Sequence, residues 1–305
     1  MQGEPLSAIS VDVEDYFQTE SFARDVRRDE WPAFPSRVVD NTRRVLEIFA
    51  RHDVRGTFFV LGWVAERFPD LVREIRDAGH ELGCHSYWHR LIYTLTPEEF
   101  EADTRRAKAA IEDAAGAPIA CYRAPTFSIT KRSMWALDVL ARCGFTRDSS
   151  IFPIYHDHYG IVGSPVRPYA IECDAATVTE FPMSTFRALR YDFPVGGGGY
   201  LRMLPLWFNR FGMRKILDSG RPAMVYLHPW EIDPGQPRIR TRLKSRLRHY
   251  TNLAGFQRNL EALLRTFRFG TMSDVIATMP PLSRYAPAGG DGLIPAKAGG
   301  TTQPA

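Results

Sequence analysis

Residues 54–84, VRGTFFVLGWVAERFPDLVREIRDAGHELGC, contain one complete strand–helix–strand unit. The β-branched and aromatic run at residues 54–61 predicts a buried strand. Residues 69–78 have helical periodicity, with a proline at the start and Gly79 directly after the end, and this predicts a helix. Residues 81–84 predict a second, short strand. A strand, a helix and a strand of these lengths indicate a parallel pair joined by a crossover helix.

The same alternation continues on both sides of this unit. Further strands are predicted at residues 7–13, 119–123, 145–148, 177–181 and 223–227. Further helices are predicted at residues 36–52, 97–114, 131–143, 201–217 and 241–267. The four glycines at residues 196–199 predict a loop that needs positive φ or a close backbone approach. The chain is therefore expected to be an α/β protein with a parallel sheet, either open or closed into a barrel.

The composition narrows the class of protein. The 305 residues are 44% hydrophobic and 24% charged, which excludes a mostly disordered chain. No run approaches the roughly 18 apolar residues that span a bilayer, and the first residues carry no export signal, so a cytoplasmic location is expected. The four cysteines lack C-x-x-C spacing and are expected to be reduced thiols. Residues 281–305, rich in Ala, Gly, Pro and Thr, are expected to be a disordered tail.

A basic segment at residues 238–248 stands out against the formal net charge of +4. Its cationic residues are Arg238, Arg240, Arg242, Lys244, Arg246 and Arg248. We interpret it first as a solvated helix face, because no nucleic-acid motif accompanies it. An anionic polymer, a membrane surface or nucleic acid are the alternatives that this charge density allows.

Carboxylates and imidazoles follow two of the predicted strands. Asp12, Glu14 and Asp15 lie where the first strand ends, and clustered carboxylates need a cation or a shared proton to relieve their repulsion. His85 and His89 follow the strand at residues 81–84, and two imidazoles four residues apart can converge on one metal. Sites form at the carboxyl ends of parallel strands, so these groups are candidates for one metal centre. Alternatively, the carboxylates form an acidic turn exposed to solvent, and the histidines lie in the core with their hydrogen bonds satisfied.

Two further strand ends carry single candidates. Arg123 ends the strand at residues 119–123 and is suited to hold a carboxylate ionised and oriented. His228 ends the strand at residues 223–227, where nearby acids would make it a general acid near neutral pH. Alternatively, Arg123 forms a purely structural salt bridge, and His228 is a buried histidine that hydrogen-bonds to the backbone.

These motifs together resemble a known family. Asp-x-Glu-Asp from Asp12, His-Ser-x-x-His from His85, Arg-x-Pro from Arg123 and Leu-His at His228 occur in the order of the NodB-homology polysaccharide deacetylases, carbohydrate esterase family 4. Residues 58–62, FFVLG, and 79–83, GHELG, strengthen the resemblance. The second half, with its glycine run and the HPWE sequence after Leu227, resembles a subgroup associated with exosortase-linked exopolysaccharide synthesis.

The resemblance implies a distorted (β/α) barrel with about seven parallel strands and a bound divalent metal, usually zinc. It implies that Asp12 is the catalytic base, that Arg123 holds this carboxylate in position and that His228 is the general acid. His85 and His89 match metal ligands. The third ligand position of the family falls on Val13, so we choose Glu14 on the same strand face as Asp12, with Asp15 as the alternative.

Two other family features are altered in this sequence. The usual Asp/Trp motif is replaced, and Asp148 is the nearest candidate to tune the late histidine. Trp88 or Trp230 is then the candidate for the missing aromatic wall.

The resemblance also implies the reaction and the domain organisation. The expected enzyme is a hydrolase of linear amides that removes N-acetyl groups from amino sugars of a polysaccharide, with the exopolysaccharide synthesis machinery as a candidate partner. Residues 1–280 are the expected catalytic domain, in which about 161–280 are a subgroup-specific second half. A hydrolase of another C–N bond, such as a cyclic amide or ureide, and a catalytically silent glycan-binding protein are the alternatives.

Overall fold

Seven parallel strands form the centre of the fold, as a computed structural model of the chain shows for residues 5–156, 159–188, 191–288 and 292–296. Along the sheet they are β10 (Met224–Leu227), β1 (Ser7–Val13), β2 (Thr57–Val60), β3 (Glu81–Cys84), β4 (Cys121–Tyr122), β5 (Arg147–Asp148) and β7 (Thr177–Glu180). The predicted α/β class with about seven parallel strands is confirmed. The row of hydrogen-bonded strands has two ends and does not close into a complete ring, so the barrel is a distorted one.

The sheet continues past β7 with strands that the sequence did not predict. They are β6 (Tyr169–Glu172), antiparallel to β7, then β12 (Arg284–Pro287) and β13 (Leu293–Pro295). The prediction of a disordered tail is therefore wrong for β12 and β13, because the free edge of β6 accepts β12 and Tyr285 packs edge-on against Tyr169. Residues 289–291 and 297–305 lie outside the described residues. The remaining strands are β11 (Phe269–Gly270), beside the start of β1, and the hairpin β8 (Thr185–Ala188) and β9 (Tyr191–Pro194).

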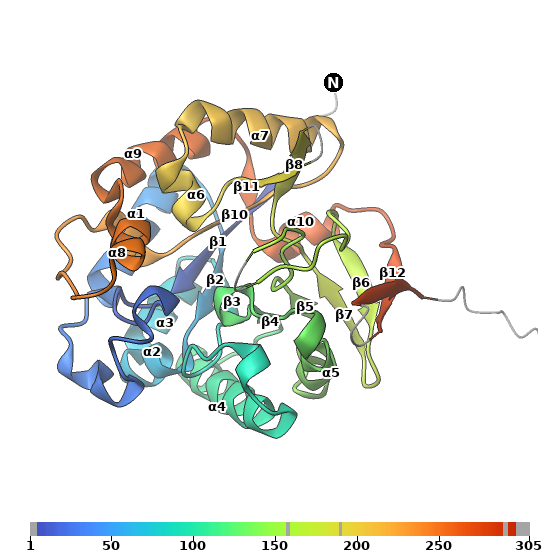
Figure 1. Cartoon of the computed structure of the whole chain (residues 1–305), viewed down its shortest axis with the longest axis horizontal. Coiled ribbons are helices and arrows are strands. Elements are labelled where there is room, and N and C mark those ends of the chain that lie inside the picture. Colours follow the sequence, from blue (N-terminus) through green and yellow to red (C-terminus); the bar gives the residue numbers. More distant parts are fainter. Residues whose placement is uncertain (1–4, 157–158, 189–190, 289–291, 297–305) are drawn as a thin grey trace, which may run out of the picture.

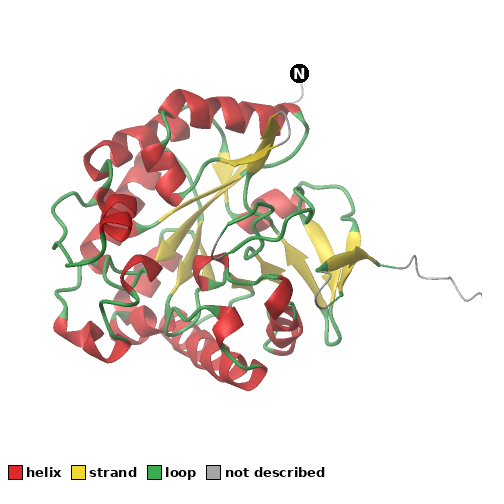
Figure 2. Ribbon diagram, in the orientation of Figure 1, coloured by secondary structure: helices red, strands yellow, loops and turns green. Residues whose placement is uncertain are grey.

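The helices of the first half lie outside the sheet, as Figure 2 shows. They are α1 (Val38–Arg51), α2 (Gly62–Arg67), α3 (Pro69–Asp77), α4 (Pro97–Ala115) and α5 (Trp135–Arg142). In α4, Thr96 and Glu99 form a reciprocal capping box, and Gly116 ends the helix in the left-handed conformation. The helices α1, α3 and α5 lie within predicted helices, and α4 extends one residue past its predicted end, since their amphipathic stripes are strong and their ends are marked by proline or glycine.

The helices of the second half divide the two predicted ones, and α10 was not predicted. They are α6 (Gly198–Met203), α7 (Leu206–Asp218), α8 (Leu243–Tyr250), α9 (Leu253–Leu264) and α10 (Met272–Ala277). The single helix predicted for residues 201–217 is wrong, because Pro205 cannot continue α6 and instead precedes α7. The single helix predicted for residues 241–267 is divided at Asn252, whose φ of 53° is left-handed. Short 3-10 turns lie at Glu20–Phe22, Arg28–Ala33, Ile92–Thr94, Pro125–Phe127, Lys131–Ser133 and Pro229–Ile232.

The glycine run is half loop and half helix. Gly196 has a φ of 73°, and Gly197 packs so closely on Tyr226 of β10 that an added Cβ would lie 1.9 Å from the ring. The loop predicted for residues 196–199 therefore ends at Gly197, and α6 begins at Gly198. Close backbone approach is the reason for glycine at position 197. Figure 1 shows α6 and α7 beside β10, on the side of the sheet away from β12.

No helix among the described residues is long and apolar enough to cross a membrane.

Candidate active site

The strand register brings the predicted site residues to one edge of the sheet. β1 lies between β10 and β2, with Val11 opposite Leu227 and Asp12 opposite Phe59. In the next pairs, Val60 lies opposite Cys84, which in turn lies opposite Tyr122. All these strands are parallel, so the residues that end or follow them converge at their carboxyl ends.

Asp12 and Arg123 form a buried ion pair. Arg123 Nη1 donates to Asp12 Oδ1 at 2.8 Å and to Ser10 Oγ at 2.7 Å. Arg123 Nε donates to the carbonyl of Ser149 at 3.1 Å, and Nη2 donates to the Ser149 hydroxyl at 2.9 Å. The guanidinium is fully buried, so these partners hold both its charge and its orientation. Removing one member of such a pair leaves an uncompensated buried charge.

Glu14, His85 and His89 form a compact buried cluster. One ligand atom from each lies within 4.8 Å of the others. His85 Nδ1 is 2.8 Å from the carbonyl of Arg123, a contact that directs the Nδ1 proton there and leaves Nε2 as the lone-pair nitrogen. Glu14 Oε2 is 2.9 Å from His89 Nε2, yet this buried oxygen has no partner in hydrogen-bond geometry among the described residues.

The electrostatics of this cluster favour the ligand forms of its groups. Burial alone would raise the pKa of Glu14, but the neighbouring imidazoles, His89 first, outweigh it and lower the pKa to about 2. Burial lowers the pKa of His85 to about 4, so that its imidazole is neutral at pH 7. Ser86 and His89 have positive φ angles of 64° and 50°. Such conformations are costly away from glycine and gather at functional sites.

Asp15, the alternative third ligand, does not join the cluster. Its Oδ2 accepts hydrogen bonds from the Ser36 hydroxyl at 2.6 Å and from the backbone N–H groups of Arg37 and Val38 at 2.9 and 3.2 Å. Its Oδ1 accepts from the backbone N–H of Tyr16. The carboxylate therefore serves the unpaired N–H groups at the start of α1, which is why it turns away from the histidines.

His228 faces both carboxylates across the site. Its Nε2 lies 3.9 Å from Asp12 Oδ2 and 3.7 Å from Glu14 Oε1. Its Nδ1 lies 3.1 Å from Glu231 Oε2, and the other oxygen of Glu231 accepts from Arg202 Nε at 2.6 Å. Burial would lower the pKa of His228, but the bond to Glu231 and the surrounding carboxylates raise it to about 9. The imidazole is therefore protonated at neutral pH.

Trp230 is the aromatic wall of the site. Its ring stacks on His228 with centroids 5.0 Å apart, and on its other side it stacks on His249 at 4.1 Å. Its Nε1 donates to Glu14 Oε1 at 3.2 Å. Trp88, the other candidate, packs against Trp31 instead.

Asp148 does not tune His228, and that prediction is wrong. Its Oδ1 accepts from the Ser150 hydroxyl, whose oxygen in turn accepts from the backbone N–H of Ala124. Burial raises the pKa of Asp148 to about 6. Burial, together with the charge of Asp148, holds the pKa of Glu180 well above its usual range. Asp148 on β5 and Glu180 on β7 thus lie next to the end of β4, which Arg123 follows, and support it.

Glu231 and Arg202 are the site residues that the sequence analysis did not single out. Glu231 follows His228 by three residues on the 3-10 turn Pro229–Ile232, so their i, i+3 spacing was the available signal. Arg202 lies on α6, and nothing in its local sequence indicates that it pairs with Glu231.

Comparison with known proteins agrees with this geometry. Residues 29–147 match the polysaccharide deacetylase family. Over this segment the chain is similar to that family. Residues 149–277 match a second family, described as a domain of unknown function (DUF3473).

Curated relatives are similar to this chain over about one third of its length. The peptidoglycan-N-acetylglucosamine deacetylase of Bacillus cereus is 30% identical over 98 residues, which are 32% of this chain and 36% of that protein. The chitooligosaccharide deacetylase of Rhizobium leguminosarum bv. trifolii is 32% identical over 101 residues, which are 33% of this chain and 44% of that protein. The matched region thus spans less than half of the length of either relative.

The fold is shared over nearly the whole chain with one solved structure. A Mycobacterium smegmatis protein assigned as a polysaccharide deacetylase superposes with a TM-score of 0.61 at 18% identity. The superposition covers 93% of this chain and 95% of that one. The second half is therefore part of the same overall fold.

Proposed function

We propose that this protein hydrolyses N-acetyl groups on the amino sugars of a polysaccharide. The observation that carries the proposal is the position of His228 Nε2, which lies 3.9 Å from Asp12 Oδ2 at the edge of the Glu14–His85–His89 cluster. An amide hydrolase needs a base for the attacking water and an acid for the departing amine, because an amine leaves poorly unless it is protonated. Two of this protein's relatives are named a peptidoglycan-N-acetylglucosamine deacetylase and a chitooligosaccharide deacetylase.

The Glu14–His85–His89 cluster fits a divalent metal. Two imidazole nitrogens and one carboxylate are the donor set of catalytic zinc sites, which leave a further position for water or substrate. The buried Glu14 Oε2, without a hydrogen-bond partner among the described residues, is the kind of atom that a cation would satisfy. A bound divalent metal, zinc by this donor set, would polarise the amide carbonyl and lower the pKa of a water.

The protein's own groups supply the two proton transfers. The Arg123 guanidinium stabilises the Asp12 carboxylate, and Asp12 Oδ2 accepts a proton from the attacking water. His228, kept protonated by Glu231, donates its Nε2 proton to the amide nitrogen as the C–N bond breaks. Water adds to the carbonyl carbon, and acetate and the free amine leave. Trp230 fixes the plane of the imidazole by stacking.

The polymer that we propose is an exopolysaccharide, and its synthesis machinery is the proposed partner. The support is the resemblance of the second half, with its glycine run and the residues around His228, to the exosortase-linked subgroup.

Acetate release from N-acetylglucosamine oligomers tests the function. The assay is run on the full chain as purified, after chelation and after zinc is added back. Release that chelation removes and zinc restores is the expected result. No release from either these oligomers or a native N-acetylated exopolysaccharide, with zinc bound stoichiometrically, would reject the hydrolase and favour a glycan-binding protein.

A further inference from the structure

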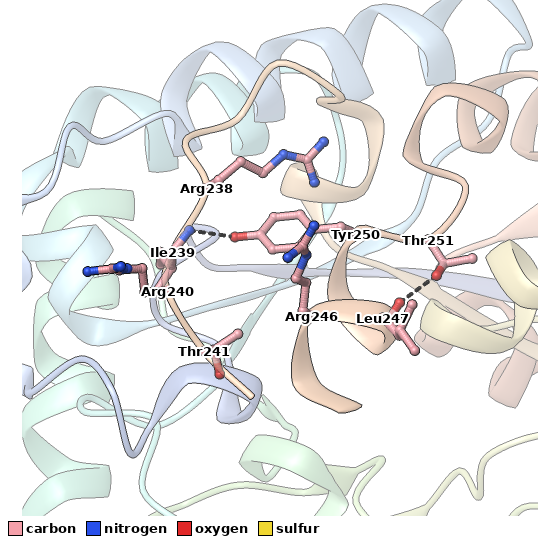
Figure 3. Close-up of a pocket in the computed structure, with 8 residues that line it drawn as sticks. All are labelled: Arg238, Ile239, Arg240, Thr241, Arg246, Leu247, Tyr250 and Thr251. Atoms are coloured by element: carbon pink, nitrogen blue, oxygen red, sulfur yellow. Dashed lines mark hydrogen bonds between the residues drawn. The ribbon is translucent and has the colours of Figure 1, made fainter. Parts of the chain in front are cut away.

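A second hollow lies at the basic segment, outside the site described above. It has a volume of about 780 Å³ and is lined by residues 238–241 and by residues 246, 247, 250 and 251 of α8 and its end. Figure 3 shows Arg238, Arg240 and Arg246 around it, together with Tyr250. The Tyr250 hydroxyl accepts a hydrogen bond from the backbone N–H of Ile239 at 2.9 Å, which ties the extended segment to the helix. We call this hollow the basic pocket.

The three arginines of the basic pocket are exposed cations without a partner acid. Among the described residues, no carboxylate lies within ion-pair distance of Arg238, Arg240 or Arg246. Arg238 lies over the Tyr250 ring, 4.2 Å from its centroid. Asp25 is the acid at the rim, and it accepts a hydrogen bond from the Thr241 hydroxyl at 2.6 Å. Positive charge therefore predominates in the basic pocket, next to an aromatic face.

A chain of ring contacts, two stacked and one edge-on, joins the basic pocket to the site. His228 stacks on Trp230 and Trp230 on His249, whose ring centroid lies 4.7 Å from that of Tyr250. Tyr250 also packs against Phe22, on the 3-10 turn Glu20–Phe22 that follows β1. Trp230 follows β10 and Phe22 follows β1, the two strands whose ends carry His228 and Asp12, so these ring contacts connect the basic pocket to the site.

We propose that the basic pocket is a subsite for acidic groups of the polysaccharide whose N-acetyl group is hydrolysed at Asp12 and His228. This inference rests on the proposed function and adds that the substrate is an anionic glycan. Guanidinium groups pair with carboxylates in two parallel hydrogen bonds, and the Tyr250 ring offers a sugar an apolar face. Its position beside the site favours the same glycan over nucleic acid or a membrane surface.

Direct binding tests the proposal independently of turnover. The probes are two labelled hexasaccharides of equal length, one of alternating glucuronate and N-acetylglucosamine and one of N-acetylglucosamine alone. The full-length protein is titrated at about 50 mM salt, where charge interactions are weakly screened, and fluorescence anisotropy is measured. The pocket variant carries Arg238→Gln, Arg240→Gln and Arg246→Gln. The control variant carries Arg44→Gln, Arg132→Gln and Arg214→Gln, three exposed arginines outside the pocket, so that both lose the same charge.

The wild-type protein is expected to bind the acidic hexasaccharide at least about tenfold more tightly than the neutral one, the effect of one charge-assisted hydrogen bond. The pocket variant should lose this preference and the control variant should keep it. If both variants lose this preference equally, it depends on the net charge of the protein and not on the basic pocket, and the proposal is overturned. Tighter binding of single-stranded DNA of matched charge, or of phosphatidylglycerol vesicles, would also overturn it.

Acetate release from the two hexasaccharides separates this proposal from the proposed function. Pocket-dependent binding without release from either probe would leave the subsite standing and count against the hydrolase. Release from the neutral probe, without a preference for the acidic one in binding, would keep the hydrolase and reject the subsite.

Discussion

The two sides of the candidate site are built in different ways. On one side, Asp12, Glu14, His85 and Arg123 lie at the ends of neighbouring parallel strands, and hydrogen-bonded register sets their positions. On the other side, His228 also follows a strand, but a chain of side chains holds it. In that chain Glu231 bonds to Arg202 of α6, which also donates to the carbonyls of Arg248, His249 and Thr251. The strand side is thus specified locally, and the His228 side depends on distant segments.

The largest expected effect lies on the strand side. Asp12→Asn removes the proposed base while keeping its shape, so acetate release should fall by about 10³-fold, within the range for general-base loss. Bound zinc should remain, because Asp12 is not in the Glu14–His85–His89 cluster. Acetate assays and metal analysis of the same preparations measure both. Asp15→Asn is the matched control, and normal turnover by Asp12→Asn would remove the base assignment.

The choice between two carboxylates sharpens the assignment of the strand side. Glu14→Ala should weaken zinc binding more than about 100-fold, beyond the effect typical of an outer-shell change. Asp15→Ala should keep zinc affinity and lower the free energy of unfolding by about 0.5–2 kcal/mol, because it removes the cap of α1. Zinc titration against a fluorescent chelator and urea unfolding measure the two quantities. If Glu14→Ala keeps its zinc affinity and Asp15→Ala loses it, the third ligand is Asp15 and not Glu14.

On the His228 side, we expect a displaced pH profile. The proposed acid must be protonated, so activity should be present at neutral pH and should fall as the pH rises through about 9. Glu231→Gln removes the charge that raises this pKa, so the fall should move to lower pH. The measurement is kcat/KM from pH 6 to about 10. His228→Gln, the control, should lack this limb, and an unmoved limb in Glu231→Gln would assign it to another group.

A further expected effect concerns the glycine run at residues 196–199, within which α6 begins. Gly197→Ala would place a Cβ 1.9 Å from Tyr226, so we expect a loss of about 1–3 kcal/mol in unfolding free energy, as for overpacking. Gly199→Ala, two residues along, meets nothing closer than 3.8 Å and should leave stability unchanged or raise it slightly. Urea unfolding of both variants tests the pair. If the two variants are equally stable, close packing against Tyr226 is not the reason that position 197 requires glycine.

Much of the first half was predictable because its signals are local. Residues 57–60 and 81–84 form strands as predicted, since apolar runs bounded by turns or glycine need no distant information. The late strand β12 was not predictable, because it forms only against the free edge of β6. The helix division at Asn252 was missed because its left-handed conformation has only a weak sequence signal.

The sequence by itself determined which donor types follow which strands, and the alternation of side chains along a strand placed Asp12 and Glu14 on one face. Only the tertiary structure decided that Asp15 serves the N–H groups of α1, that Glu231 and not Asp148 holds His228, and that Trp230 forms the wall. The reason is physical: backbone periodicity acts between neighbouring residues, whereas a buried charge takes whichever partner the folded chain brings within hydrogen-bond distance.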